Sequence, residues 1–455
     1  MSIREVLYTK KYLNEVLHTT LNPNEPGAVR IHLVPSKFSI FKARPSVVIL
    51  NGKDIIPLNK AWAILFSIFI REVNRYEGRG ISKQDIKNIV KNTVEKTRGV
   101  YRKAGRIEIK EDLKDMIKTF MDIAINGHTD RDIGQMTIGE YAPNMVAPHR
   151  MDLMISSMIK NEKWNCNQKC LHCYAAGQRY AELDELSTED WKKVIDICRK
   201  NCISQITFTG GEPTIRKDLV ELIEYSKWFV TRLNTNGVLL TKKLCKDLYK
   251  ASLDNVQITF YSNDEKIHNE LVGAENYEKT LGGIKNAIEA GLNVSINTPL
   301  CKINKNYIDT LKFLKELGII YVTCSGLIVT GNAEGEKSKK TQLSKTEITK
   351  IIKDAKKFAD ENGMEIAFTS PGWIDEEVLR KLKMDVPSCG AGLSNMAIAP
   401  NGDVVLCQSW LSDGNLGNIL KTNWKKIWNS PSCKKQRNFA RKSEFTCPLK
   451  KGECK

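Results

Sequence analysis

The sequence lacks any uninterrupted apolar stretch that approaches the ~18 to 20 residues needed to cross a bilayer, so no transmembrane helix is expected. Its first residues, MSIREVLYTKKYLNEV, contain no compact apolar segment after the first charges, which argues against a secretory signal. We therefore expect a cytoplasmic protein that has no membrane partner.

Cysteine is absent from the first 165 residues and abundant afterwards. There are 13 cysteines, and an odd number without a secretory signal argues against a disulfide framework. Three cysteines fall within residues 166–173, and five lie in the last 67 residues. In a reducing compartment, grouped cysteines bind metals or clusters more often than they form disulfides. The two groups therefore predict two separate metal centres.

Composition and charge limit the classes of protein that remain. The 455 residues are 41% hydrophobic and 27% charged, which is typical of a folded globular protein of about two to four domains. A net charge of +17 suits a nucleic acid, an anionic membrane or an acidic peptide as partner. Much of the excess is lysine spread over expected helices, as in Lys242–Lys250 and Lys350–Lys357, where it keeps the protein soluble. We therefore expect no nucleic-acid partner.

Between about residues 150 and 370, short apolar runs alternate with amphipathic stretches. The expected strands are Leu153–Met158, Gln205–Thr209, Thr231–Asn234, Asn255–Phe260, Leu292–Asn297 and Ile319–Cys324. Serine caps and glycine stops mark helices over Trp191–Lys200, Tyr277–Ala290, Tyr307–Leu317 and Lys345–Ala359. Six strand–helix repeats predict an α/β fold, a partial (β/α)6 barrel of the TIM type, with functional residues at the carboxyl ends of the strands.

The regions on either side of the repeats have different patterns. In residues 1–148, Asn51-Gly52 is a strong hairpin signal. It lies between Val47–Leu50 and Ile55–Leu58 and precedes helical stretches over Trp62–Val73, Lys83–Lys96 and Glu111–Ile125. This order predicts a winged-helix-like module. Residues 371–455 are rich in Gly, Pro and Cys and poor in apolar runs, so we expect a domain that needs a metal to fold. The expected domains are therefore 1–148, 149–370 and 371–455.

The sharpest motif is Cys166-Asn-Gln-Lys-Cys170-Leu-His-Cys173-Tyr174, which begins just after the first expected strand. Three thiolates are one too few for a closed zinc site or a fully ligated 4Fe-4S cluster. One iron of such a cluster would therefore stay open to bind a small molecule. A structural zinc knuckle is the alternative. His172 lies inside the loop between two cysteines, and we expect it not to be a ligand.

A second motif, Gly210-Gly211-Glu212-Pro213, directly follows the second expected strand. Paired glycines let the backbone approach a ligand closely. Glu212 supplies a negative charge that suits an ammonium group. Taken alone the motif is a turn, but its place one strand after the three cysteines predicts a ligand site.

Together with Leu233-Asn-Thr-Asn-Gly237, these motifs resemble the radical S-adenosylmethionine (SAM) superfamily over roughly residues 155–370. The resemblance implies that Cys166, Cys170 and Cys173 hold a 4Fe-4S cluster whose open iron is chelated by SAM. It further implies SAM contacts at Tyr174, Gly210, Gly211, Glu212, Pro213, Asn236 and Asn297. The implied chemistry belongs to the cofactor: the reduced cluster splits the sulfonium, and the resulting 5′-deoxyadenosyl radical abstracts hydrogen from the substrate. A low-potential electron donor such as flavodoxin or ferredoxin is then an implied partner.

The C-terminal cysteines resemble the SPASM or twitch extension of radical SAM enzymes, which carries auxiliary 4Fe-4S clusters. Cys389, the Asn401-Gly402 turn and Cys407 match its opening half, whereas the tail has fewer cysteines than the full pattern. The resemblance implies one auxiliary cluster held by Cys389, Cys407, Cys447 and Cys454, with Cys433 as a further candidate. The alternatives are a second, incomplete cluster, or zinc at the same four cysteines.

The remaining cysteines fall inside the expected barrel. Cys198, Cys202, Cys245 and Cys301 are expected as buried packing residues, because free cysteine behaves as a small hydrophobe. Cys324 ends the sixth expected strand, where we expect it to face the barrel mouth. It is therefore the candidate catalytic residue, as a hydrogen donor or radical relay.

The resemblance also bears on the substrate. SPASM enzymes mostly modify peptides or proteins, and the N-terminal region resembles the winged-helix domain of peptide-maturation enzymes, which binds a leader peptide as an added strand. The lysine surplus suits an acidic leader, and an unrelated helical cap is the alternative. A maturase of a ribosomal peptide is therefore implied, which installs a crosslink, an epimerisation or a side-chain oxidation. The alternatives are a maturase of a protein or small-molecule cofactor and, outside the enzymes, an iron–sulfur redox sensor.

Overall fold

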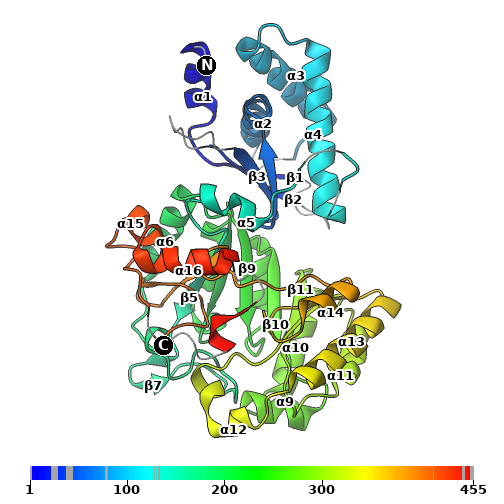
Figure 1. Ribbon diagram of the computed structural model, residues 1–455, viewed down its shortest axis with the longest axis vertical. Coiled ribbons are helices and arrows are strands. Elements are labelled where there is room, and N and C mark those ends of the chain that lie inside the picture. The colour runs from blue at the N-terminus through cyan, green and yellow to red at the C-terminus, as the bar shows by residue number, and fades with distance from the viewer. Residues whose placement is uncertain are drawn as a thin grey trace. The chain divides into compact units, whose positions relative to one another are not determined.

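The computed structural model describes residues 3–21, 29–36, 45–76, 80–127, 129–131, 134–412, 414–442 and 446–450. The chain divides into two compact units, Met1–His149 and Arg150–Lys455, and each is described by itself (Figure 1). Among the described residues, no helix is both long enough and apolar enough to span a membrane.

The first unit contains a four-stranded antiparallel sheet in the order β1-β2-β3-β4. Its strands are β1 (Leu17–Leu21), β2 (Val29–Val34), β3 (Ser46–Leu50) and β4 (Asp54–Leu58). The expected hairpin is β3–β4, and both Asn51 and Gly52 adopt the positive φ that its turn requires. Strands β1 and β2 were not expected, because half-polar runs such as Leu17–Leu21 carry only a weak strand signal.

Helices pack on this sheet and on one another. They are α1 (Ile3–Tyr12), α2 (Lys60–Val73), α3 (Lys83–Val100), α4 (Arg106–Asn126) and the short α5 (Ile138–Tyr141). Three of these are the expected helices, and α1 is additional. Helix α2 is central: residues 63–70 are all buried, and the Phe66 ring meets that of Phe120 edge-on at 5.0 Å. The unit therefore has its own hydrophobic core.

The second unit is built on a nine-stranded sheet in the order β13-β12-β11-β10-β9-β8-β5-β14-β15. Its strands are β5 (Arg150–Ser156), β8 (Gln205–Gly210), β9 (Val230–Thr235), β10 (Asn255–Thr259), β11 (Val294–Pro299), β12 (Tyr321–Ser325), β13 (Glu365–Phe368), β14 (Asn395–Ile398) and β15 (Val404–Val405). Every pairing is parallel except that of β14 with β15. The partial barrel is thus confirmed, with the six expected strands in the expected order. Strand β14 pairs with β5, so the cysteine-rich segment extends the same sheet.

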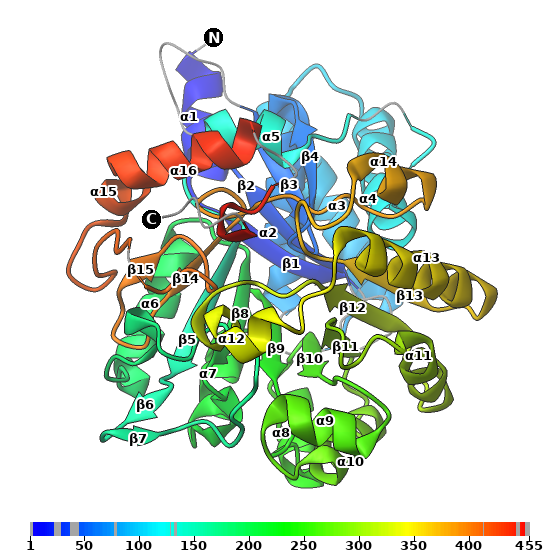
Figure 2. The ribbon, with the colours of Figure 1, turned by 60° about the horizontal axis from the view of Figure 1, so that its bottom comes forward.

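The helices of this unit follow the strands as expected. They are α6 (Thr188–Lys200), α7 (Leu219–Tyr225), α8 (Lys242–Lys250), α9 (Glu265–Val272), α10 (Tyr277–Glu289), α11 (Tyr307–Glu316), α12 (Glu336–Lys339), α13 (Lys345–Glu361), α14 (Glu376–Lys381), α15 (Trp424–Trp428) and α16 (Pro431–Lys442). Ser187 caps α6 and Ser344 caps α13, as the sequence indicates. Figure 2 shows α7, α8, α10 and α11 along the outer side of the curved sheet.

The two faces of the parallel sheet differ in polarity. The outer face carries fully buried apolar side chains: Leu153, Phe208, Leu233, Ile258, Ile296 and Val322. The strand registers place polar side chains on the inner face: Asp152, Thr207, Arg232, Asn234, Gln257, Asn297, Tyr321 and Thr323. Parallel sheets are usually apolar on both faces because both are covered. A polar inner face therefore indicates a lumen that meets water or a polar ligand.

Candidate active site

The loop that carries the first three cysteines follows β5 and is pinned on one side by α9. The Lys169 N–H donates to the Val272 carbonyl at 3.0 Å, and the Leu171 N–H donates to the Leu271 carbonyl at 2.9 Å. Gly273 follows α9 with φ +63°, and a Cβ there would lie 2.4 Å from the Lys169 carbonyl oxygen. Only glycine therefore allows this close approach.

The other side of the loop is held by the short 3-10 helix η5 (Gly331–Glu334). The Asn332 N–H donates to the Cys173 carbonyl at 2.9 Å, and the Asn332 side-chain amide donates to the Cys170 carbonyl at 3.1 Å. A Cβ on Gly331 would lie 2.5 Å from the Tyr174 carbonyl oxygen. The backbone of the cysteine loop is thus fixed between two distant segments. Sequence reasoning missed both, although the glycines 273 and 331 were the available signal.

Cys166, Cys170 and Cys173 are free and partly buried. Burial raises the pKa of the Cys166 thiol to about 12 and that of Cys170 well above its usual range. These thiols are therefore protonated until iron displaces their protons. Within the described segments, no three Cys, His, Asp or Glu side chains gather as the ligands of one metal ion would. Each thiolate of a 4Fe-4S cluster binds a different iron, so the three thiols of such a site need not meet at one ion.

His172 lies in the same loop and makes its contact elsewhere. Its Nε2 is 2.8 Å from the Thr341 hydroxyl, and burial lowers the pKa of the imidazole to about 4. The ring is therefore neutral at physiological pH. Because its imidazole contacts Thr341, His172 fits the role of a residue that stabilises the loop.

Glu212 lies at the carboxyl end of β8 and joins this strand to β9. Its side chain is only 1% exposed. Oε1 accepts from the Thr214 N–H (3.0 Å), the Thr214 hydroxyl (2.5 Å) and the Thr235 hydroxyl (2.6 Å), and Oε2 accepts from the Asn236 N–H at 2.8 Å. Burial raises the pKa of Glu212, and these hydrogen bonds oppose the rise. Because Oε1 already has three donors, Oε2 is the oxygen with room for a ligand ammonium.

Asn236 connects this carboxylate to the cysteine loop. Its side-chain amide donates to Asn167 Oδ1 at 2.6 Å, one residue after Cys166. The structure thus brings Cys166, Glu212 and Asn236 together, as the motif spacing predicts. Gly210 has φ +140°, and a Cβ there would lie 2.3 Å from the Ser156 carbonyl oxygen, so β8 can approach β5 only with glycine at this place. Gly211 donates its N–H to the same oxygen at 2.9 Å.

The other expected SAM contacts lie at different distances from this centre. Pro213 is buried at the start of a 3-10 helix, Pro213–Ile215. Tyr174 is partly buried, and burial with the neighbouring Cys173 raises the pKa of its phenol, which bonds to Thr209. Asn297 is on the inner face of β11, where its Oδ1 accepts from the Thr323 hydroxyl at 2.9 Å. Strands β9 and β10 lie between β11 and β8, and Glu212 follows β8. Asn297 and Glu212 are therefore two strands apart in the sheet.

Cys324 is not where the sequence predicted it. It is fully buried on the same face of β12 as Val322, which is the outer face that meets the helices. Burial raises the pKa of its thiol, and the phenol of Tyr307 on α11 is a neighbour. The expectation that Cys324 faces the barrel mouth is therefore wrong, because alternation along the strand turns its side chain outward.

The C-terminal cysteines form two neighbourhoods. The loop after Cys389 meets the strand before Cys407 through the Gly392 N–H, which donates to the Leu406 carbonyl at 3.2 Å. Burial raises the pKa of Cys407 to about 11. The nearby thiol of Cys447 also raises this pKa through electrostatic repulsion. Cys389 Sγ is 3.8 Å from the Gln436 amide, and Cys433 Sγ is 3.4 Å from the Arg437 guanidinium, both on α16.

Cys433 therefore lies closer to the other candidate ligands than its distance along the sequence suggests, since α16 places it beside the segment that carries Cys389. Gly392, three residues after Cys389, would place a Cβ 3.6 Å from the Cys433 carbonyl oxygen. Cys454, the fourth expected ligand, lies outside the described residues. The ligand set of the auxiliary site thus stays a prediction.

Comparison with known proteins identifies the class first. Residues 165–314 match the family model of the radical SAM superfamily, and residues 389–455 match that of the SPASM iron–sulfur cluster-binding domain. The chain thus contains a radical SAM domain followed by a SPASM domain. The predicted cofactors are confirmed at this level: the first domain binds SAM and a 4Fe-4S cluster, and the second binds auxiliary iron–sulfur clusters.

Individual relatives match smaller parts. A probable GTP 3′,8-cyclase of Thermococcus kodakarensis is 33% identical over 159 residues, which is 34% of this chain and 52% of that protein. The Fe-coproporphyrin III synthase of Methanosarcina barkeri is 27% identical over 297 residues, 59% of this chain and 73% of that protein. The chain spans about half the length of the first curated relatives it matches.

Two solved structures share the fold. Streptococcus suis SuiB bound to the precursor peptide SuiA has a TM-score of 0.61 at 16% identity, over 90% of this chain and 94% of that one. The enzyme anSMEcpe with bound AdoMet has a TM-score of 0.51 at 17% identity, over 64% of this chain and 84% of that one. At these identities the likeness establishes the fold alone.

Proposed function

We propose that the protein cleaves SAM reductively at a cluster held by Cys166, Cys170 and Cys173 and modifies a ribosomally made peptide. The observation that carries the first half is the hydrogen-bonded chain from the Glu212 carboxylate through Asn236 to the cysteine loop. This chain fixes a carboxylate next to three thiols at the carboxyl edge of a parallel sheet, where barrels hold their chemistry.

The chain's own residues have distinct tasks in this proposal. Glu212 Oε2 receives the SAM ammonium. Gly210 and Gly211, which are also proposed to contact SAM, let the end of β8 pack closely against Ser156 and Ser157. Tyr174, Asn236 and Asn297 are proposed as further contacts. When bound, the cluster and SAM supply one-electron chemistry that yields a hydrogen-abstracting radical, with the electron from a donor such as flavodoxin or ferredoxin. The inner face of the sheet then positions the substrate.

Release of 5′-deoxyadenosine tests the first half. Protein reconstituted with iron and sulfide without oxygen, reduced with dithionite and given SAM is expected to release the nucleoside over many minutes. A Glu212→Gln variant should release less, because its amide nitrogen would face donors. Cys245→Ala, at a buried packing site on α8, is the matched control. No release from the wild-type protein would contradict the proposal.

The second half rests on the N-terminal unit. The fold likeness to SuiB, solved bound to its precursor peptide, spans 90% of this chain. The outer edge of β4 is already bonded, since the Met136 N–H donates to the Ile55 carbonyl at 2.9 Å. On β1 the His18 carbonyl points away from β2, towards the Asn74 amide at 2.8 Å. His18 and Thr20 therefore direct their backbone groups to the outer edge of β1, and we propose that edge for the leader.

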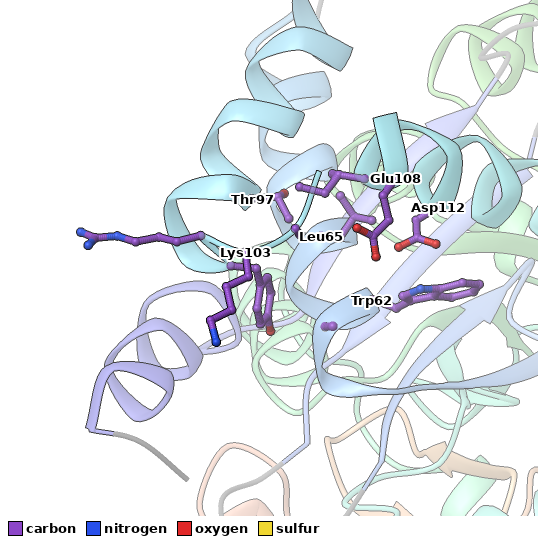
Figure 3. Close-up of a pocket in the computed structure, with 11 residues that line it drawn as sticks. Trp62, Leu65, Thr97, Lys103, Glu108 and Asp112 are labelled. Atoms are coloured by element: carbon purple, nitrogen blue, oxygen red, sulfur yellow. The ribbon is translucent and has the colours of Figure 1, made fainter. Parts of the chain in front are cut away.

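A cavity in the same unit supports a peptide ligand. It has a volume of about 480 Å³, within the range of ligand pockets, and lies among α2, α3 and α4 (Figure 3). Trp62 and Leu65 form its apolar part, and Figure 3 shows the carboxylates of Glu108 and Asp112 near the indole. Burial and the surrounding acidic side chains raise the pKa of Asp112. Arg102 and Lys103 also line the cavity, so its two acidic and two basic side chains favour neither sign of charge, and Trp62 and Leu65 suit an apolar side chain.

A proline substitution tests the β1 edge. Thr20→Pro removes a backbone N–H that points to the outer edge of β1. The hydrogen bonds between β1 and β2 are made by the other residues of β1, which alternate with His18 and Thr20, so the variant should keep them. Thr20→Ala keeps the N–H and is the control. We expect the affinity for a fluorescent candidate precursor peptide to fall about tenfold in the proline variant only, the equivalent of ~1.4 kcal/mol. Equal affinity in both variants would contradict strand addition.

The second candidate is a small-molecule cofactor as substrate. The observation in its favour is the likeness to the Fe-coproporphyrin III synthase, which spans 73% of that protein. Conversion of Fe-coproporphyrin III by the reduced, SAM-loaded enzyme, followed by mass spectrometry, would establish it. The redox sensor is not carried further, because the superfamily is one of enzymes.

A further inference from the structure

A row of polar side chains crosses the inner face of the barrel below the proposed SAM site. The registers pair Asp152 with Thr207, Thr207 with Arg232, and Arg232 with Asn255, so these four residues lie side by side on β5, β8, β9 and β10. Arg232 precedes Asn236 by four residues on β9, which corresponds to about 13 Å along a strand. The row therefore lies deeper in the barrel than the proposed SAM site, towards the amino ends of the strands.

The charges of this row are not balanced. Arg150 Nε lies 3.0 Å from Asp152 Oδ1, so these two groups form an ion pair in which Asp152 is buried and the Arg150 side chain is 33% exposed. Arg232 has neither an ion pair nor a hydrogen bond to any residue that the structure describes. Its neighbouring charged or titratable groups are Arg150, Tyr321 and Asp152. Of these three, Arg150 has the largest electrostatic effect on the pKa of Arg232.

A partly buried guanidinium beside a second guanidinium is energetically unfavourable unless an anion compensates it. Burial and the Arg150 charge both lower the pKa of Arg232, which is the direction expected for a cation without a counterion. Asp152 compensates the Arg232 charge only in part, because it already pairs with Arg150. Guanidinium groups bind carboxylates and phosphates with two parallel hydrogen bonds.

We propose that Arg232 binds an anionic group of the substrate, a carboxylate or a phosphate, and thereby sets which substrate carbon reaches the radical. Gln257, Asn297 and Thr323 lie between this anchor and the mouth, and the Gln257 amide donates to the Thr323 hydroxyl at 3.2 Å. They offer polar contacts to the connecting part of the substrate. The role of Arg232 in catalysis rests on the proposed function. The binding of an anion at Arg232 does not depend on that function.

The simpler explanation is that Arg232 is a hydrated structural residue. The two explanations differ in one measurable property, since only an anchor binds a small anion saturably at a single place. Charge on the protein surface is a source of error because the chain carries +17. Surface attraction is screened by salt, so the titrations are made at constant, physiological ionic strength.

The test titrates the full-length, cluster-loaded protein with inorganic phosphate and, separately, with acetate by calorimetry. We expect one saturable site, with an affinity at least tenfold weaker in Arg232→Gln. Arg380→Gln is the matched control, because Arg380 on α14 is exposed, pairs with Glu376 and loses the same charge. Tighter binding of acetate would favour a carboxylate substrate, and tighter binding of phosphate a phosphorylated one.

Three results would overturn the inference: no saturable site in the wild-type protein, equal affinity in Arg232→Gln, or an equal loss in Arg380→Gln. If Arg232→Gln does not fold, Arg232→Lys, which keeps the charge but loses the two-pronged geometry, should bind phosphate several-fold more weakly than the wild-type protein. The titration needs neither SAM nor a reductant. Anion binding without 5′-deoxyadenosine release would therefore contradict the proposed function and leave the anchor intact.

Discussion

The two cysteine groups are held in different ways. The backbone of the loop with Cys166, Cys170 and Cys173 is bonded to α9 on one side and to η5 on the other, with glycines at both close approaches. Cys389 and Cys433 contact side chains of α16, and Cys447 bonds through its N–H to the Pro371 carbonyl at 3.3 Å. The first site is thus shaped by the protein before iron binds, whereas the second depends more on the cluster for its geometry.

The largest expected effect is at the first site. Cys170→Ala should abolish 5′-deoxyadenosine release and remove about four irons per chain, on four irons per cluster. The fold should persist, because the loop is held by backbone hydrogen bonds rather than by the thiol. Chromatographic assay of the nucleoside, with iron analysis, measures both. Cleavage that survives the substitution would refute the ligand assignment.

The corresponding change at the second site should have a different result. Cys407→Ala is expected to lower iron from about eight to about four per chain while cleavage of SAM without substrate continues. Cys198→Ala, a buried cysteine on α6, is the control and should keep all its iron. Unchanged iron in the Cys407 variant would remove this cysteine from the auxiliary site.

A glycine pair tests whether the protein shapes the first site. Gly273→Ala places a Cβ 2.4 Å from a carbonyl oxygen at φ +63°, whereas Gly291→Ala has φ +80° with its nearest atom at 3.5 Å. Both variants incur the left-handed backbone cost of about 1 to 2 kcal/mol, and both should show a lower Tm. Only Gly273→Ala should also bind less iron at the first site. Equal iron in the two variants would show that the close approach does not shape the loop.

The smallest expected effect concerns the protein without iron. Removing the clusters with a chelator and a mild oxidant should increase proteolytic cleavage after residue 385, since side-chain contacts hold Cys389 and Cys433 and the cluster would fix their geometry. Cleavage in residues 165–175 should rise less. Mass spectrometry of the early fragments measures both rates, and equal exposure of the two regions would remove the contrast between the sites.

The barrel could be predicted well because its signals are local. Serine caps, glycine stops and alternating apolar runs mark each strand and helix. The structure also places Glu212, Asn236 and the loop of Cys166 together, while the SAM contacts assigned to them stay a prediction. Strands β13 to β15 could not be predicted in this way, since they are short and gain stability from pairing within the sheet.

The errors concern the direction of side chains. Cys324 was placed at the mouth from its position at a strand end, although its spacing of two from Val322 already indicates the outer face. The same alternation puts Arg232 and Asn234 on the inner face. Asn234 lies within the Leu233–Gly237 motif, but no motif includes Arg232. Charge balance inside the barrel depends on partners from several strands, and the sequence alone does not pair them.

The central claim is that an open iron at the Cys166–Cys173 loop binds SAM. Electron paramagnetic resonance of the reduced, oxygen-free protein tests it most directly, on the wild-type protein and on the Cys407→Ala variant, in which only this cluster should remain. The account predicts that SAM shifts the g-values of the signal in both proteins and that Cys170→Ala shows no such shift. Identical spectra with and without SAM in the wild-type protein would contradict it.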